Sequence, residues 1–369
     1  MFGDYLIPFL IVLTVLVFVH EWGHYIVARW NNVRVEVFSV GFGPELFGRT
    51  DSAGTRWRFS AIPLGGYVKF FGDAEATSST QSDDDHLTAA ERKVSFHGKT
   101  VGQRAAIVFA GPAANFLFSI LLLALLFTFY GHPFPYSVVG NVLPDSPAES
   151  AGIEPGDKIM RIGETDVGRF VEVSVAIRSA PPGPFEIEVE RSGESLIFDV
   201  EPEMVEVELV DGTTQEIPRI GIGADTTQSR PFVAIGEATT ESVSIAWQTL
   251  GALGEMIVGS RGTEELGGPI RIAQMSGNVA QVGVAALLWF MAILSINLGL
   301  INLFPIPMLD GGHLMFYGIE AMRGRPLNER AQEIGFRIGL ALVLTLVVFT
   351  TWNDFVQLDV LGYFRGLFS

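Results

Sequence analysis

Residues 5–28 read YLIPFLIVLTVLVFVHEWGHYIVA, an apolar run that ends in the ionisable stretch His20-Glu-Trp-Gly-His24. On a helix, residues four apart share one face, so His20 and His24 can bind a single metal ion. Glu21 lies one position further round, where its carboxylate can take a proton from a metal-bound water. Ionisable side chains at membrane depth are costly. The placement therefore predicts a functional site rather than two histidines satisfied by hydrogen bonds at a helix end.

The apolar residues make up 48% of this 369-residue chain and are bunched into runs long enough to span a membrane. Four such runs predict an α-helical polytopic membrane protein: about Tyr5–Ala28, Ala105–Tyr130, Val284–Phe304 and Ile334–Thr351. The first run has the length of a signal-peptide core, but no basic segment precedes it and no small-residue cleavage site follows. We therefore expect it to be retained. The chain has no cysteine, which excludes thiol catalysis, cysteine-ligated zinc and disulfides.

The net charge of −17 is unevenly distributed along the chain. Residues 131–282 contain 24 acidic and 9 basic residues, whereas residues 29–104 carry ten of the 24 lysines and arginines. Basic loops tend to stay in the cytoplasm, and the short connection 309–333 with its three arginines falls on the same side as residues 29–104. The pattern predicts an extracytoplasmic acidic region and both termini outside. We expect no nucleic-acid binding, because the soluble parts have no sustained basic patch.

Between the first two spans, Arg56–Ile62 and Gly66–Phe70 are predicted as two strands of a membrane-associated β-hairpin around the turn Pro63-Leu-Gly-Gly66. This hairpin is either a simple cytoplasmic meander or a sheet edge that receives an extended substrate. Residues 73–91 are rich in serine, threonine and aspartate and are predicted to be a solvated, mobile spacer. Farther on, Thr240–Ser260 is predicted as an amphipathic helix that either packs on the outer region or lies on the membrane surface.

Residues 136–205 are predicted to form an inserted α+β domain. Ser146-Pro-Ala148 starts a short helix and Gly152 ends it, while Gly156-Asp157 turns into the next strand. A further helix at 171–179 and strands at 185–190 and 196–200 follow. This punctuation resembles the bacterial PDZ domain, which implies either a peptide receptor or a steric gate. The predicted domains are a membrane part at 1–135, the PDZ domain at 136–205, an acidic extension at 206–282 and a second membrane part at 283–369.

A catalytic zinc ion normally has three protein ligands, so a third one is expected elsewhere in the chain. The extended pattern that would supply a third histidine fails, because Val27 and Trp30 occupy its positions. The strongest candidate is Asp310, in Asn302-Leu-Phe-Pro-Ile-Pro-Met-Leu-Asp310-Gly-Gly-His313, where two prolines break an apolar span. The alternative is an interfacial aspartate that caps the next helix.

These elements together resemble the site-2 protease family of intramembrane zinc metalloproteases, and most closely its RseP-type (regulator of sigma-E protease) branch. The matching motifs are the histidine stretch, Gly41-Phe-Gly-Pro44, Gly65-Gly-Tyr-Val68, Gly111-Pro-Ala-Ala-Asn115, the PDZ pattern and the Asn302–His313 element. One PDZ domain is predicted where the best-known enterobacterial members have two.

The resemblance implies that His20, His24 and Asp310 bind Zn²⁺, that Glu21 is the general base and that Asn302 contacts the substrate backbone. It also implies a bacterial inner-membrane enzyme in contact with the lipid bilayer. Its substrates would be single-span membrane proteins of the anti-sigma-factor type, already cut by an upstream protease, or remnant signal peptides. Two alternatives are a membrane metal-ion transporter, which would carry more polar residues along its spans, and a catalytically inactive PDZ scaffold, which would usually have lost Glu21 or a ligand.

Overall fold

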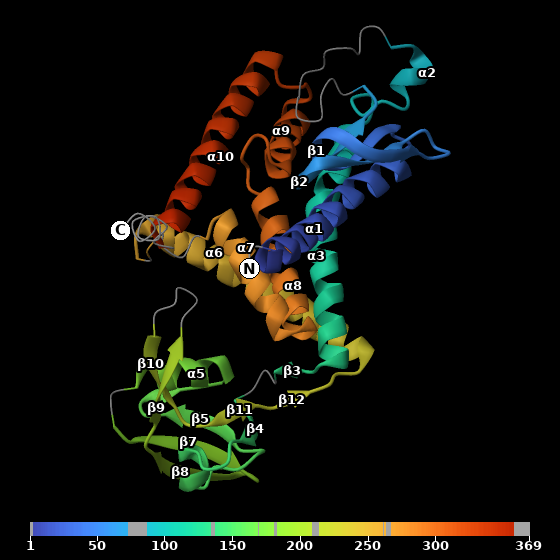
Figure 1. Cartoon of the computed structure of the whole chain (residues 1–369). Coiled ribbons are helices and arrows are strands. Elements are labelled where there is room, and N and C mark those ends of the chain that lie inside the picture. The colour runs from blue at the N-terminus through green and yellow to red at the C-terminus, as the bar shows by residue number, and fades with distance from the viewer. Residues whose placement is uncertain are drawn as a thin grey trace. The chain divides into compact units, whose positions relative to one another are not determined.

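The computed structural model describes residues 3–72, 87–133, 137–168, 170–180, 183–208, 214–260, 262 and 267–357. The chain forms two compact units (Figure 1), one made of Met1–Ala124 with Ile235–Ser369 and the other of Leu125–Ala234. The spacer predicted at 73–91 lies outside the described residues except for its last five, which contribute to the short helix α2 (Ala89–Arg92).

Among the described residues, four helices that lie wholly or mostly in the first unit are long and apolar enough to cross a membrane. They are α1 (Gly3–Trp30), α3 (Val101–Phe129), α8 (Val284–Asn302) and α10 (Glu329–Gln357). Each coincides with one of the four predicted spans, so the prediction of a polytopic helical membrane protein is confirmed. A helix suits this environment because it satisfies every backbone polar group within itself.

Three further helices of this unit are shorter or less apolar: α6 (Pro231–Val258), α7 (Pro269–Val282) and α9 (Asp310–Arg323). The predicted amphipathic helix begins earlier than expected, since α6 starts at Pro231. It packs through small residues one turn apart, Ala238 and Ser242, which are both buried. The Ser242 hydroxyl lies 3.4 Å from that of Ser119 on α3. Trp247, on another face of α6, is 75% exposed. Packing on the outer region and binding to the membrane surface both stay predictions for this helix.

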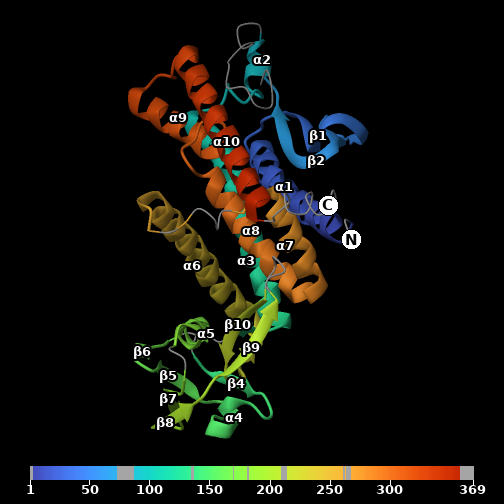
Figure 2. The same ribbon diagram turned by 60° about the vertical axis from the view of Figure 1, so that its left-hand side comes forward.

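Strands β1 (Val35–Thr50) and β2 (Arg56–Phe70) form a sheet beside α1 (Figures 1 and 2). The predicted hairpin is partly wrong. The tight turn between the two strands lies at residues 51–55, and the segments 56–62 and 66–70 do not pair with each other. Phe38 of β1 pairs instead with Trp57 and also with Val68, so the first part of β1 lies between the two halves of β2. The proline and glycines at Pro63–Gly66 mark the point where β2 passes the end of this first part of β1 and returns along its other side.

The second unit is a small α+β fold. Its main sheet is antiparallel in the order β6-β5-β7-β8, and β4 pairs with β11 beside it. Helix α4 begins after its predicted cap Ser146 and ends at Gly152, which has a left-handed φ of 91°. The strands are β3 (His132–Pro133), β4 (Val139–Val142), β5 (Lys158–Ile162), β6 (Thr165–Asp166), β7 (Phe185–Arg191), β8 (Glu194–Val200), β9 (Glu203–Glu208), β10 (Thr214–Arg219), β11 (Ile222–Ala224) and β12 (Thr226–Thr227), and the helices are α4 (Pro147–Ala151) and α5 (Phe170–Ser179).

The core of this unit extends past the boundary predicted at residue 205. Ile220 is buried together with Val139, Ile159 and Ile187 in one apolar cluster. The strand β11 that follows Ile220 pairs with β4 near the start of the unit. Ile220 and β11 therefore complete the fold of the second unit, although the acidic composition after residue 205 suggested a separate extension.

Candidate metal centre

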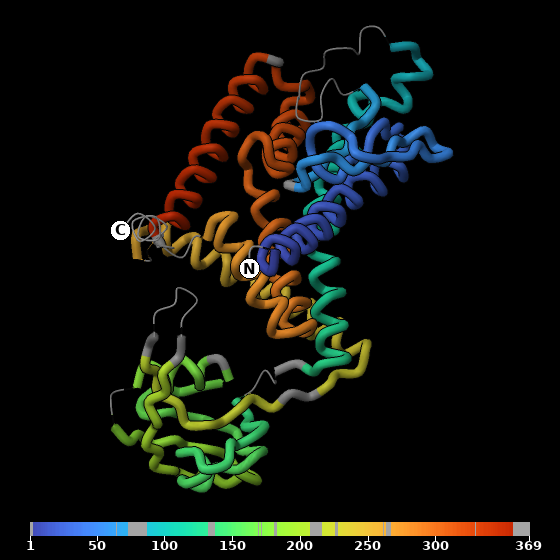
Figure 3. The backbone as a smooth tube through the Cα atoms, in the orientation of Figure 1, coloured from blue at the N-terminus to red at the C-terminus, as the bar shows by residue number. Residues whose placement is uncertain are grey.

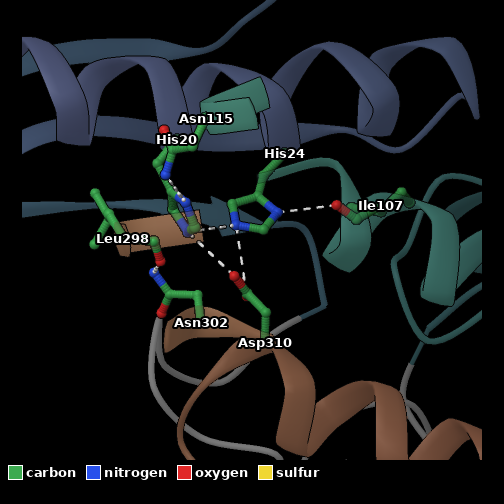
Figure 4. A network of polar contacts seen from close by, with 7 residues as sticks. All are labelled: His20, His24, Ile107, Asn115, Leu298, Asn302 and Asp310. Carbon is green, nitrogen blue, oxygen red and sulfur yellow. Dashed lines mark hydrogen bonds and ion pairs between the residues drawn. The ribbon is translucent and has the colours of Figure 1, made fainter. Parts of the chain in front are cut away.

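Two histidines of α1 and one aspartate of α9 bring their side chains together. His20 and His24 lie one helical turn apart on the same face, and their Nε2 atoms are 3.2 Å from each other. Oδ2 of Asp310 lies 3.1 Å from Nε2 of His20, and Oδ1 lies 3.5 Å from Nε2 of His24 (Figure 4). The structure thus assembles the three predicted ligands from segments almost 290 residues apart in the sequence.

The donor set and its burial fit a divalent cation. The two histidines are only 8% and 9% exposed, and one ligand atom from each of the three side chains lies within 4.8 Å of the others. Oδ2 of Asp310 is buried and makes no hydrogen bond of normal geometry, although Nε2 of His20 lies 3.1 Å away. Such a carboxylate oxygen is costly to bury unless a cation compensates it. Two imidazole nitrogens and one carboxylate, with a fourth position left to water or substrate, are the usual ligands of catalytic zinc.

Helix α3 packs against the ring of His24 and fixes its orientation. Nδ1 of His24 donates a hydrogen bond to the main-chain oxygen of Ile107, at 2.9 Å, which leaves Nε2 of that ring free to bind a metal. Gly111, one turn along α3, lies directly against the His24 ring: a Cβ atom there would be 2.5 Å from Cε1 of His24. Sequence reasoning found Gly111 only as part of a resemblance, and it could not have found a main-chain oxygen.

Asp310 reaches the histidines because the chain is not helical just before it. Helix α8 ends at Asn302, and α9 begins at Asp310 after a stretch that contains the two prolines (Figure 3). Met308 in this stretch has a φ of 95°, a left-handed value that is unusual for a side chain with a Cβ. A Cβ on Gly312 would lie 2.6 Å from the main-chain carbon of Ile306, so glycine is needed for α9 to pack on this stretch. Asp310 is the first residue of α9 rather than its cap, so the capping alternative is wrong.

The two predicted catalytic residues line a cavity of about 420 Å³ that also contains the three ligands. Glu21 lies on α1 between the histidines. Asn302, the last residue of α8, donates one amide hydrogen to the main-chain oxygen of Leu298, at 3.0 Å. Its amide oxygen and second amide hydrogen are not part of that bond. The structure therefore brings both residues to the cavity that the metal ligands line, and their catalytic roles stay predictions.

The cavity is also lined by an ion pair that sequence reasoning missed. Arg104 of α3 donates to the Glu320 carboxylate of α9, at 2.6 Å, and its guanidinium lies over the ring of Tyr317. The side chains of Arg104 and Glu320 are 13% and 14% exposed. The pair joins the first turn of α3 to the helix that carries Asp310. It was not predictable because its partners are 216 residues apart.

Comparison with known proteins adds a family assignment. The model of Peptidase family M50 matches residues 8–346. A relative from Rhizobium meliloti is 46% identical over 360 residues, which cover 95% of this chain and 96% of the relative, and one from Agrobacterium fabrum is 45% identical with 96% of each covered. The names of both describe zinc metalloproteases. A metalloprotease of Caulobacter vibrioides is 35% identical, with 99% of this chain and 98% of the relative covered.

Proposed function

This chain belongs to peptidase family M50, the site-2 protease family of zinc metalloproteases, and we propose that it hydrolyses peptide bonds at membrane depth with a zinc ion held by His20, His24 and Asp310. The observation that carries the proposal is the convergence of these three side chains at 3.1–3.5 Å, two of them in a helix apolar enough to span a membrane. Zinc bound there acts as a Lewis acid and supplies a reactive water at neutral pH.

Glu21 is the proposed general base. It follows His20 directly on α1 and lines the same cavity as the three ligands, which supports a role in activating a water there. In the proposed reaction, Glu21 accepts the proton of that water and then gives it to the leaving amine. Asn302 has a substrate-binding role, because its remaining amide groups can hold the backbone of the substrate or the oxygen that gains charge.

The substrate must be unwound before it reaches this cavity, because a helix shields its own peptide bonds. The β1–β2 sheet is suited to hold the extended form by strand addition. Gly66, Tyr67 and Val68 of β2 line the cavity, and their pairing in the sheet is with the segment of β1 on one side. We propose that the substrate strand is held along this part of β2.

The unit formed by residues 125–234 is proposed to be an extracytoplasmic PDZ domain. Two features support this assignment. Helix α4 begins after the cap Ser146 and ends at the left-handed Gly152, as the PDZ pattern predicts, and the main sheet has the antiparallel order β6-β5-β7-β8. This domain would act as a size filter or as a peptide receptor. In either role it would admit single-span membrane proteins of the anti-sigma-factor type after cleavage by an upstream protease. Remnant signal peptides are a second substrate class.

The orientation belongs to the same proposal. The multi-pass chain would lie in the bacterial inner membrane, with both termini extracytoplasmic and the metal centre towards the cytoplasm. The support is the lysines and arginines of two connections, ten at 29–104 and three at 309–333, set against the strongly acidic residues 131–282.

A pair of variants tests the assignment of the site. Glu21→Gln should retain one zinc ion per chain and lose cleavage, whereas Asp310→Ala should lose zinc. A proteomic comparison of membrane fractions from cells with wild-type and Glu21→Gln protein should show a trimmed membrane fragment that accumulates with the variant. Full activity of Glu21→Gln would refute the base assignment, and unchanged zinc stoichiometry in Asp310→Ala would remove that residue from the ligand set.

A further inference from the structure

Asn115 of α3 is a buried polar residue that the reaction described above does not use. It is fully buried, and its Nδ2 lies 3.1 Å from Nδ1 of His20 (Figure 4). Its Oδ1 is buried without a hydrogen-bond partner. The main chain at this point is fixed, because the Ser295 hydroxyl of α8 donates to the Asn115 carbonyl oxygen at 2.8 Å. Burial of an amide oxygen without a hydrogen bond costs free energy, so the residue calls for an explanation.

The tautomer of a metal-bound imidazole determines whether the oxygen or the nitrogen of the Asn115 amide should face Nδ1 of His20. A neutral histidine that binds a metal through Nε2 carries its hydrogen on Nδ1, so that nitrogen is a donor. His24 already meets this condition, because its Nδ1 faces the carbonyl oxygen of Ile107. His20 does not meet it with an NH₂ group opposite Nδ1, since two donors would then face each other at 3.1 Å.

We infer that Asn115 is a positioning residue for His20 and presents its Oδ1, not its Nδ2, to Nδ1–H of that ring when the site holds zinc. This inference rests on the proposed ligand set. A half-turn of the amide about the Cβ–Cγ bond exchanges the two atoms at nearly unchanged shape and needs no backbone movement. The hydrogen bond then fixes both the tautomer of His20 and the plane of its ring.

The spacing along α3 supports the inference. Ile107, Gly111 and Asn115 follow one another at intervals of four residues and therefore share one face of this helix. That face offers an acceptor for His24, a gap that accommodates the His24 ring and, once the Asn115 amide is turned, a second acceptor for His20. One helix thus orients both rings of the histidine pair on α1, so that both Nε2 atoms point at Asp310.

The test measures zinc affinity in the purified full-length chain by competition with a chelator. Asn115→Leu, which keeps the volume and removes the hydrogen bond, should weaken zinc binding by about 10–100-fold. Asn115→Asp, which can only accept, should bind zinc within about threefold of wild type, because a carboxylate also fixes a metal-binding histidine. Ser119→Ala is the matched control: it removes a buried hydroxyl one turn further along α3, away from the ligands, and should leave the affinity unchanged.

The outcomes separate this inference from the proposed ligand set. Wild-type affinity in Asn115→Leu would overturn the inference, and so would an equal loss in Asn115→Leu and Asn115→Asp. If His20→Ala kept wild-type zinc affinity, the ligand set itself would fail. A thermal melt in the presence of excess chelator shows whether each variant is folded. If Asn115→Leu does not fold, a tenfold loss in folded Asn115→Asp is sufficient to overturn the inference.

Discussion

Gly111→Ala is the substitution that the geometry of the site makes most informative. A Cβ at this position would lie 2.5 Å from Cε1 of His24, and closer still to Nε2, the nitrogen proposed to bind zinc. The ring cannot easily turn away, because its Nδ1 is held by the carbonyl oxygen of Ile107 at 2.9 Å. The added methyl group must therefore displace the ring as a whole or push α3 away from α1.

The size of the effect follows from the distances. Ordinary van der Waals contact begins near 3.4 Å, so Cε1 must move by about 0.9 Å. A misplacement of about 1 Å at a catalytic group can cost roughly 100-fold in rate. Helix propensity acts in the opposite direction, since alanine in a helix interior is favoured over glycine by about 1 kcal/mol. We therefore expect Gly111→Ala to lose about 100-fold in kcat/KM and to bind zinc more weakly, while thermal stability changes little.

The assay compares this variant with Gly102→Ala, which lies on the same helix and would have no atom within 4 Å of its new Cβ. Both proteins are purified in detergent and measured for zinc content at a limiting zinc concentration, for thermal melting and for cleavage of a model single-span substrate. The control should keep wild-type activity and be as stable as wild type or slightly more so. Wild-type zinc affinity and activity in Gly111→Ala would show that the ring of His24 is not confined as described.

Two further substitutions test how each unit is held together. Arg191→Ala should destabilise the second unit by about 3 kcal/mol. Asp157 is only 1% exposed and would lose the guanidinium that donates two hydrogen bonds to it. Faster hydrogen exchange in β5 and β7 would report the loss. Burial opposes ionisation of Asp157, but the bonds from Arg191 hold its pKa below the usual value, so this contribution is present above about pH 4 and is lost as the pH falls through the lowered pKa. In the first unit, Asp354 of α10 accepts from the main-chain nitrogens of Gly268, Ile270 and Arg271 at the start of α7. Asp354→Ala should lower the melting temperature through a loss of about 1–2 kcal/mol, with a smaller loss in Asp354→Asn; equal melting of all three proteins would refute the capping role.

The membrane helices were predictable because their signal is local. Each span is a continuous apolar run, and a helix is the structure that satisfies its backbone within the segment. The sheet was harder to predict, because pairing depends on segments that are distant in sequence. Pro63 and the glycines after it correctly marked a change of direction, but nothing near Arg56–Phe70 shows that the first part of β1 lies between its two halves.

The site was predictable where chemistry requires particular residue types. Two histidines four apart and an aspartate after a broken helix are rare enough to be found by inspection. The supporting groups were not predictable in the same way. The Ile107 acceptor is a main-chain atom, and the acceptor that we infer on Asn115 depends on which side of α3 faces α1. Packing decides that choice, and the two helices are more than 70 residues apart in the sequence.

Glycines show how that packing is achieved. Apolar side chains gain nothing from leaving lipid for a helix interface, so close approach of the backbones must supply the contact energy. A Cβ on Gly23, between the two zinc-ligand candidates, would lie 2.7 Å from Cβ of Ala114 on α3, and one on Gly66 of β2 would lie 2.7 Å from the carbonyl oxygen of Ser39 and 3.2 Å from Cγ of Glu21. Gly111 adds the space for His24. The helix that carries the histidine stretch is thus held between α3 and the sheet by positions that have no side chain. These glycines accompany the ligands because the acceptors on α3 can reach the histidine rings only at this short distance between the backbones.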